Sequence, residues 1–135
     1  MIMSLHHTRE PLQYISEIYR ILKPGGLFII REHDVKDEID KAILDALHAL
    51  YCISWAKTGE QEDPDYHLHH YAVYKSKELW TSHMNSVGFN RLETPELNIL
   101  YKANDIDRYY NHYKFNKYMP NSVLAFWACY QKPSY

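Results

Sequence analysis

The sequence is poor in glycine and cysteine. Its 135 residues include 4 glycines (Gly25, Gly26, Gly59 and Gly88) and no G-x-G pattern. This excludes from the sequence a glycine-rich loop, which would let the backbone approach the phosphates or sugar of a nucleotide cofactor. The 2 cysteines, Cys52 and Cys129, lie in apolar stretches. Because no signal peptide precedes them, we expect reduced core residues in a cytoplasmic protein.

An excess of charge of one sign and long apolar runs are also lacking. The 15 Lys and Arg residues nearly balance the 17 Asp and Glu residues, for a formal net charge of -2. No global field attracts polyanions, so any nucleic-acid contact would need a local patch. No apolar run approaches the roughly 18 to 20 residues of a membrane span, and we expect no membrane partner. Hydrophobic residues make up 46% of the chain, which suits a single domain over residues 1–135.

The stretch from residue 8 to residue 32 predicts a helix, a turn and a strand. Apolar residues recur at helical spacing after Thr8, which we expect to be the N-cap. Lys23-Pro24-Gly25-Gly26 should end this helix, because proline cannot continue it and glycine permits positive φ. The run Leu27-Phe28-Ile29-Ile30 does not alternate with polar residues. Such a run is typical of a strand buried on both faces of a parallel sheet.

Helices and strands alternate along the rest of the chain. A second helix is predicted from about Asp37, and a third from the N-cap Ser76 to Gly88, with a polar loop at residues 58–65 between them. The predicted apolar stripe of the second helix is Ile39, Ile43, Leu47, Leu50 and Tyr51. Strands are predicted at residues 89–94 and 123–130. This order of elements predicts an α/β fold.

Several stretches together are similar to a known family. They are "SLHH", "ILKPGGLFIIREHD", "ELWTSHMNSVGF" and "VLAFWACYQK". The chain resembles the C-terminal half of a class I S-adenosylmethionine-dependent methyltransferase, and "LKPGG" leading into a strand is the most specific part. The resemblance implies a partial doubly wound, Rossmann-like sheet with flanking helices, whose last pair of strands is antiparallel. Residues 1–5 would end strand four, and residues 27–32, 89–94 and 123–130 would be strands five, six and seven.

The resemblance also implies a site at the carboxyl ends of the strands, where open α/β sheets bind ligands. His6, His7 and His33 become catalytic candidates, since an imidazole can act as a general base near neutral pH. Leu5 and His6 would contact the cofactor, S-adenosylmethionine. The implied substrate-binding residues are Arg31, Glu32, Asp34, His70 and Tyr71. A plainer interpretation is a solvated loop with exposed histidines, in which Asp34 caps the next helix.

A group of histidines precedes the third helix. His67, His69 and His70 in "DYHLHHY" raise the question of zinc, because imidazole is a common zinc ligand. The spacing is not that of a closed structural site and no cysteine lies nearby. We therefore predict no metal site and favour a substrate-covering lid at residues 67–74.

Residues 96–120 form a tyrosine-rich insertion. Its aromatic residues alternate with lysine and arginine, a mixture that can stack on single-stranded RNA. However, four of its residues follow helical spacing: Ile106, Tyr109, Tyr110 and Tyr113. A helix packed on the sheet would produce the same pattern, and the balanced charge favours this second interpretation.

Two hypotheses of function follow from the resemblance and the missing loop. In the first, the chain is a truncated or split S-adenosylmethionine-dependent methyltransferase of unspecified methyl acceptor. Activity would then need a homo-oligomer, or a separate chain that supplies the N-terminal half. In the second, it is a catalytically inactive interaction module that binds protein or RNA. A glycine-rich strand and helix encoded directly upstream would favour the enzyme.

Overall fold

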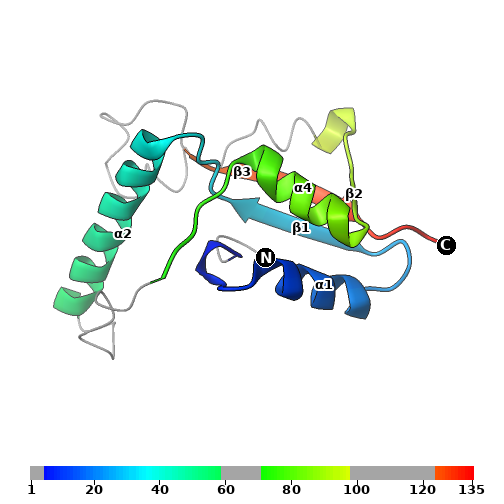
Figure 1. The fold of residues 1–135 in the computed structure, drawn as a ribbon, viewed down its shortest axis with the longest axis horizontal. Helices are drawn as coiled ribbons and strands as arrows, with labels where there is room; N and C mark the ends of the chain where they lie inside the picture. The colour runs from blue at the N-terminus through cyan, green and yellow to red at the C-terminus, as the bar shows by residue number, and fades with distance from the viewer. Residues whose placement is uncertain (1–4, 59–70, 98–123) are drawn as a thin grey trace.

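The computed structural model describes residues 5–58, 71–97 and 124–135, with the side chains of all of these except 51–58. In chain order its elements are the 3-10 helix η1 (Leu5–His7), α1 (Pro11–Ile21), β1 (Leu27–Glu32), α2 (Glu38–Thr58), α4 (Lys77–Val87), β2 (Asn90–Arg91) and β3 (Phe126–Gln131). Helices α1 and α4 lie side by side against the sheet, and α2 stands at one end of the molecule (Figure 1). The predicted α/β class is confirmed.

The sheet has the strand order β1-β3-β2, and both pairings are antiparallel. The predicted antiparallel arrangement of the last two strands is therefore confirmed, although β2 is shorter than residues 89–94 and β3 starts later than residue 123. No parallel pair occurs among the described strands, so the parallel surroundings predicted for β1 are not found there. Leu5, predicted to end strand four, lies in η1 instead, while residues 1–4 lie outside the described part.

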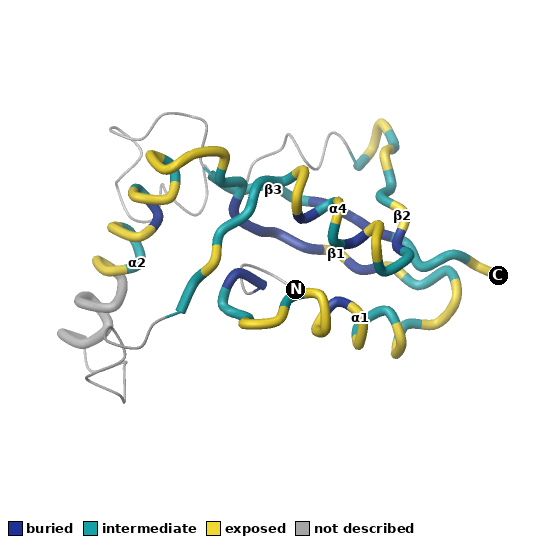
Figure 2. The backbone as a smooth tube through the Cα atoms, in the orientation of Figure 1, coloured by how far each residue is buried: buried dark blue, intermediate teal, exposed yellow. Residues whose placement is uncertain are grey.

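The hydrophobic core lies between the sheet and the two helices. Pairing of Phe28 with Tyr130 and of Ile30 with Ala128 puts these four side chains on one face of the sheet. They join buried residues of the covering segments in one cluster, which also contains Leu5, Ile15, Trp80, Met84 and Phe89. The dark blue segments of Figure 2 follow this interface. The core thus fixes η1, α1 and α4 against the same face of β1.

Strand β1 is buried on one face rather than on both. Phe28 and Ile30 are buried, whereas Leu27 and Ile29 are each 50% exposed. The prediction of a doubly covered strand is therefore wrong for its first four residues. The physical reason is that α1 and α4 both pack on the Phe28 side of the strand. The described residues cover the side chains of Leu27 and Ile29, on the opposite side, only in part. An apolar run does not report which side of a sheet the helices cover.

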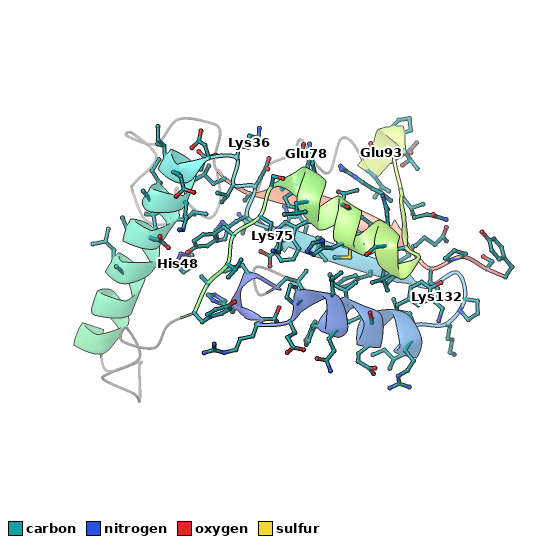
Figure 3. All side chains as sticks on the ribbon, viewed as in Figure 1. Lys36, His48, Lys75, Glu78, Glu93 and Lys132 are labelled. Carbon is teal, nitrogen blue, oxygen red and sulfur yellow. The ribbon has the colours of Figure 1, made fainter. Side chains whose placement is uncertain are left out.

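The boundaries of α1 differ from prediction at its start and agree at its end. Glu10 is the N-cap, and the Thr8 hydroxyl instead donates to the carbonyl of Leu5 at 2.7 Å, within the η1 turn. The N-cap prediction for Thr8 is therefore wrong. At the other end the helix stops before Leu22, and Gly25 has the predicted positive φ, 77°. Lys132, labelled in Figure 3, donates to two carbonyls of the last turn and complements the helix dipole.

The inward face of α2 agrees only in part with the predicted stripe, of which Ile43 and Leu47 are partly buried. Leu44 is buried, whereas Ile39 and Leu50 of the predicted stripe are exposed. The partly buried positions beside Leu44 include Leu47 and His48. Helix α2 stands at the end of the molecule (Figure 1). Its inward face meets η1 and the segment before α4, where the His48 ring lies near those of His6 and Tyr74. The amphipathic pattern alone did not locate that face.

Helix α4 has both predicted caps. The Ser76 hydroxyl accepts a hydrogen bond from the Leu79 N–H, and Gly88 follows the helix with φ 109°. A Cβ at position 88 would lie 3.1 Å from the Tyr19 hydroxyl oxygen on α1. Glycine is therefore required here both by backbone conformation and by the close approach of the two helices.

Replacement of Gly88 by alanine should lower the free energy of unfolding by about 1–2 kcal/mol, because alanine at positive φ is strained and its methyl presses on Tyr19. Urea unfolding followed by circular dichroism measures this change. Asn85→Ala, at an exposed position of the same helix, is the matched control and should change stability by less than about 0.5 kcal/mol. Equal stabilities of the two variants would contradict the close approach.

Several predictions lie outside the described residues. These concern the lid histidines at residues 67–70, the tyrosine-rich segment beyond residue 97, most of the loop at 58–65, and the side chains of Tyr51 and Cys52. Cys129 is described; it is buried on β3 and not in a disulfide, which agrees with the predicted reduced core cysteine. None of the described helices combines the length and the apolar character needed to cross a bilayer.

Candidate functional site

The carboxyl end of β1 places a buried carboxylate beneath η1. Glu32 is fully buried on the core face of the strand. Its oxygens accept hydrogen bonds from the backbone N–H of Leu5 at 2.6 Å, from the His6 ring at 2.7 Å and from the backbone N–H of His33 at 3.2 Å. Burial alone raises the pKa of Glu32, but these donors and the charge of His6 outweigh it and lower the pKa. Glu32 is therefore an ionised anchor for η1.

Four imidazoles gather around this carboxylate. The histidine cluster consists of His6 and His7 from η1, His33 after β1, and His48 from α2. Ring centroids lie 4.0 Å apart for His6 and His7, 4.7 Å for His6 and His33, and 5.6 Å for His6 and His48. Figure 3 shows His48 on the side of α2 that faces the rest of the molecule. Residues far apart in the sequence thus form one site.

Tyr74 packs beside the histidine cluster. Its ring centroid lies 5.6 Å from those of His33 and His48, and its hydroxyl lies 2.9 Å from His48 Nδ1. Burial raises the pKa of Tyr74, and the charge of Asp45 and a hydrogen bond to its carboxylate raise it further. Tyr74 therefore donates its hydroxyl proton toward Asp45, and its oxygen can accept from His48.

Every histidine of the cluster uses Nδ1 to bond an oxygen acceptor. His6 bonds the Glu32 carboxylate, and the others bond the backbone carbonyls of Tyr71, Leu124 and Leu44, at 2.8 to 2.9 Å. A carbonyl can only accept, so the Nδ1 that bonds it carries the proton, and the neutral ring keeps its lone pair on Nε2. His6 Nε2 is itself buried and, among the described residues, has no hydrogen-bond partner. The bonds fix which nitrogen can act on a ligand.

Burial favours the neutral form of two of these imidazoles, His33 and His7. Burial, followed by the charge of His6, lowers the pKa of His33 to about 3. Burial also lowers the pKa of His7, against a smaller opposing effect of its bond to the Tyr71 carbonyl. Neutral rings can accept a proton or bind a cation, whereas protonated rings can do neither.

The structure brings most of the predicted site residues together. Leu5, His6, His33 and Glu32 meet at the end of β1, and His7 is joined to Tyr71 through the carbonyl of that residue. His70 lies outside the described residues. The convergence of Leu5, His6, His7, Glu32 and His33 follows from placing η1 over the carboxyl end of β1.

Two predicted substrate residues point elsewhere. Arg31 is on the opposite face of the sheet, where its guanidinium carbon lies 5.9 Å from the ring centroid of Trp127. Asp34 accepts a hydrogen bond from the N–H of Lys77 at 2.8 Å and so caps α4. Capping of the next helix, α2, is done by Asp37, which corrects that interpretation of Asp34. Neither side chain faces the histidine cluster.

Two members of the site were missed by sequence reasoning. His48 lies within a predicted helix, four residues after Leu44, and Tyr74 lies in the segment predicted as a lid. A histidine beside the buried leucine of an amphipathic helix was the available signal. It was not used because His48 lay outside the predicted apolar stripe of α2.

One group among the described residues has the geometry to hold a metal ion. One ring nitrogen each of His6, His7 and His48 lies within 4.8 Å of the other two. The prediction of no metal site rested on His67, His69 and His70, which lie outside the described residues, and did not consider this group. The arrangement can accept protons or bind a cation.

Comparison with known proteins agrees with the predicted resemblance. The family described as a methyltransferase domain matches residues 1–30, a segment that contains η1, α1 and the first part of β1. Among solved structures, a proposed methyltransferase from Bacillus halodurans C-125 is 22% identical, with a TM-score of 0.45. That match covers 98% of this chain and 67% of that one. No curated protein matches the chain.

Proposed function

We propose that this chain, whose first 30 residues match a methyltransferase domain, forms the methyl-acceptor side of an S-adenosylmethionine-dependent methyltransferase. The observation that carries the proposal is the buried His6–Glu32 pair, 2.7 Å apart, at the carboxyl end of β1. In the doubly wound sheets that the chain resembles, ligands bind at this end of the parallel strands. The pair anchors η1, which presents the neighbouring His7 at the same place.

His7 is the imidazole best placed to take a proton from the acceptor. It is only partly buried, whereas His6 and His33 are buried, and the low pKa of His33 makes that ring a poor base. The bond from Nδ1 to the Tyr71 carbonyl holds the ring and makes Nε2 its basic atom. Removal of the proton as an acceptor oxygen or nitrogen becomes a nucleophile is general base catalysis.

The two predicted cofactor contacts, Leu5 and His6, do not fit the cofactor. Leu5 is fully buried, its N–H is already bonded to Glu32, and His6 is 1% exposed. S-adenosylmethionine would supply the methyl group, but these two predicted contacts offer it no accessible atom. We therefore propose that a separate polypeptide carrying a glycine-rich loop binds the cofactor, and that the acceptor side described above completes the site.

Two calorimetric titrations with S-adenosylhomocysteine test this division. The chain alone should give no heat, whereas the chain together with a polypeptide encoded upstream that contains a glycine-rich strand and helix should bind in the micromolar range, roughly -8 kcal/mol. In that assembly His7→Gln should keep the binding but lower the turnover by about 100-fold or more. The matched control, His83→Gln on α4, should retain both.

A catalytically inactive interaction module, binding protein or RNA, is the second candidate. It is favoured by the inaccessible Leu5 and His6 and by the half-exposed Leu27 and Ile29 on the other face of β1. This candidate predicts no S-adenosylhomocysteine binding in any assembly. An assembly that binds the ligand but transfers methyl groups equally well with His7→Gln would exclude the role of His7 alone.

A further inference from the structure

We propose that the histidine cluster binds one divalent transition-metal ion of the zinc type through ring nitrogens of His6, His7 and His48. The inference goes beyond the proposed function and does not depend on it. Methyl transfer requires no such ion, and the ion requires no cofactor. Three imidazoles are a suitable ligand set for zinc, copper or nickel, and a three-histidine set leaves a fourth position for an exogenous ligand.

The spacing of the three rings is close to that of a metal site. One nitrogen from each lies within 4.8 Å of the others. Tetrahedral zinc with bonds of about 2.0–2.1 Å holds its ligand nitrogens about 3.4 Å apart, so the nitrogens need to approach by at most roughly 1.4 Å. His48 comes from α2, whose inward face buries Leu44 alone among its described side chains. A small rotation of the rings and a shift of this helix can therefore close the site.

The hydrogen bonds around the three rings are those of metal-bound histidines. A histidine that binds a metal through one nitrogen usually donates its other N–H to a carboxylate or a carbonyl, which fixes the ring. His6 does so with Glu32, His7 with the Tyr71 carbonyl and His48 with the Leu44 carbonyl. A single bond of this kind is common. Here Nδ1 of all three converging rings makes such a bond, which holds each ring in a fixed orientation.

His6 supplies the independent observation. Its side chain is 1% exposed, and among the described residues its Nε2 has no partner. A buried polar nitrogen without a partner is destabilising, and native proteins rarely keep one. Coordination of an ion satisfies this lone pair, and the buried negative charge of Glu32 offsets part of the charge of the ion.

An ion in the cluster would change the chemistry of the proposed site. His7 would be a ligand instead of a free base, and the ion would bind and acidify the acceptor atom at its open position. The two roles of His7 are therefore alternatives that depend on metal loading. A chelator would remove activity if the loaded form is the active one, and would leave it unchanged or raise it if the free base is.

Titration of the full chain with Co²⁺, after removal of metals by a chelator, tests the proposal. Visible absorption typical of four-coordinate cobalt should rise to one equivalent per chain, and Zn²⁺ should abolish it. His48→Gln removes a ligand at a partly buried position and should weaken Co²⁺ binding about 100-fold or more. His83→Gln, which removes a histidine outside the cluster, should bind as the unaltered chain does.

The other histidines of the chain make the test decisive. Replacing His67, His69 and His70 together by glutamine should leave the cobalt spectrum unchanged. Loss of the spectrum in that variant, retention of full affinity in His48→Gln, or no binding by the unaltered chain would each overturn the proposal. If His48→Gln fails to fold by circular dichroism, His7→Gln replaces it. The S-adenosylhomocysteine titration is read separately, so failure of one proposal leaves the other intact.

Discussion

Replacement of Glu32 by alanine should destabilise the protein by about 3–5 kcal/mol, because it removes one partner of a buried, hydrogen-bonded pair. Three donors lose their acceptor at once: the N–H groups of Leu5 and His33 and the His6 ring. Since the free energy of unfolding of a domain is only about 5–15 kcal/mol, this single change removes a large part of it.

Urea unfolding followed by circular dichroism measures the effect, with Glu17→Ala as the matched control. Glu17 also loses a 2.8 Å bond, to Arg20, but both side chains are largely exposed. Exposed pairs contribute little, so the control should change stability by less than about 1 kcal/mol. Glu32→Gln, which keeps the shape and one acceptor oxygen, should fall between the two. Equal effects of Glu32→Ala and Glu17→Ala would mean that η1 is not anchored at β1.

Replacement of Trp80 by alanine should cost about 3–5 kcal/mol, because it leaves a large cavity in the centre of the core. Trp80 is fully buried on α4 and belongs to the cluster that joins the helix to Phe28 and Ile30 of β1. Its indole Nε1 is buried with no hydrogen-bond partner among the described residues. Trp80→Phe removes that unpaired group as well as some volume, so it should cost clearly less than alanine.

The adjacent residue gives the control for Trp80. Leu79 lies on the same helix with a substantial exposed fraction, and Leu79→Ala should cost less than about 1 kcal/mol. The transition is best followed by far-ultraviolet circular dichroism, since the substitution itself changes tryptophan fluorescence. A loss below 1 kcal/mol for Trp80→Ala would contradict the packing of α4 on the sheet.

Features that depend on neighbouring residues were predictable from the sequence. The strand β1 begins at Leu27 and ends at Glu32, as expected from the glycine turn before it and the polar residues after it. Ser76 and Gly88 bound α4 because a hydroxyl acceptor and a positive φ are needed at its ends. In these cases the interactions that decide the structure span only a few residues.

Features that depend on distant segments were not predictable in the same way. The exposure of Leu27 and Ile29 is decided by which side of the sheet α1 and α4 cover. The inward stripe of α2 contains Leu44 rather than Ile39, because η1 and the segment before α4 determine its face. Thr8 has the chemistry of an N-cap but bonds the η1 turn instead. Local sequence preferences allow more than one structure at these positions, and the packing of distant segments determines which one forms.

The same difference between local and distant interactions separates the predicted from the missed residues of the candidate site. The resemblance located His6, His7, His33 and Glu32, since they stand next to the helix and strand that carry it. His48 enters from a helix that has no recognisable motif, and its role depends on the place of α2 in space. Arg31 differs from Glu32 by one position, and the strand pleat turns it to the opposite face.

The order of the strands constrains how the chain can be made. The central described strand, β3, contains the last residues of the sheet to leave the ribosome, and it pairs Leu27 with Gln131. Until β3 emerges, β1 and β2 have no described strand partner, and the backbone hydrogen bonds that join each of them to β3 cannot form. The described sheet is therefore expected to form only after β3 has been synthesised, and its incomplete strands are prone to aggregation or chaperone binding until then.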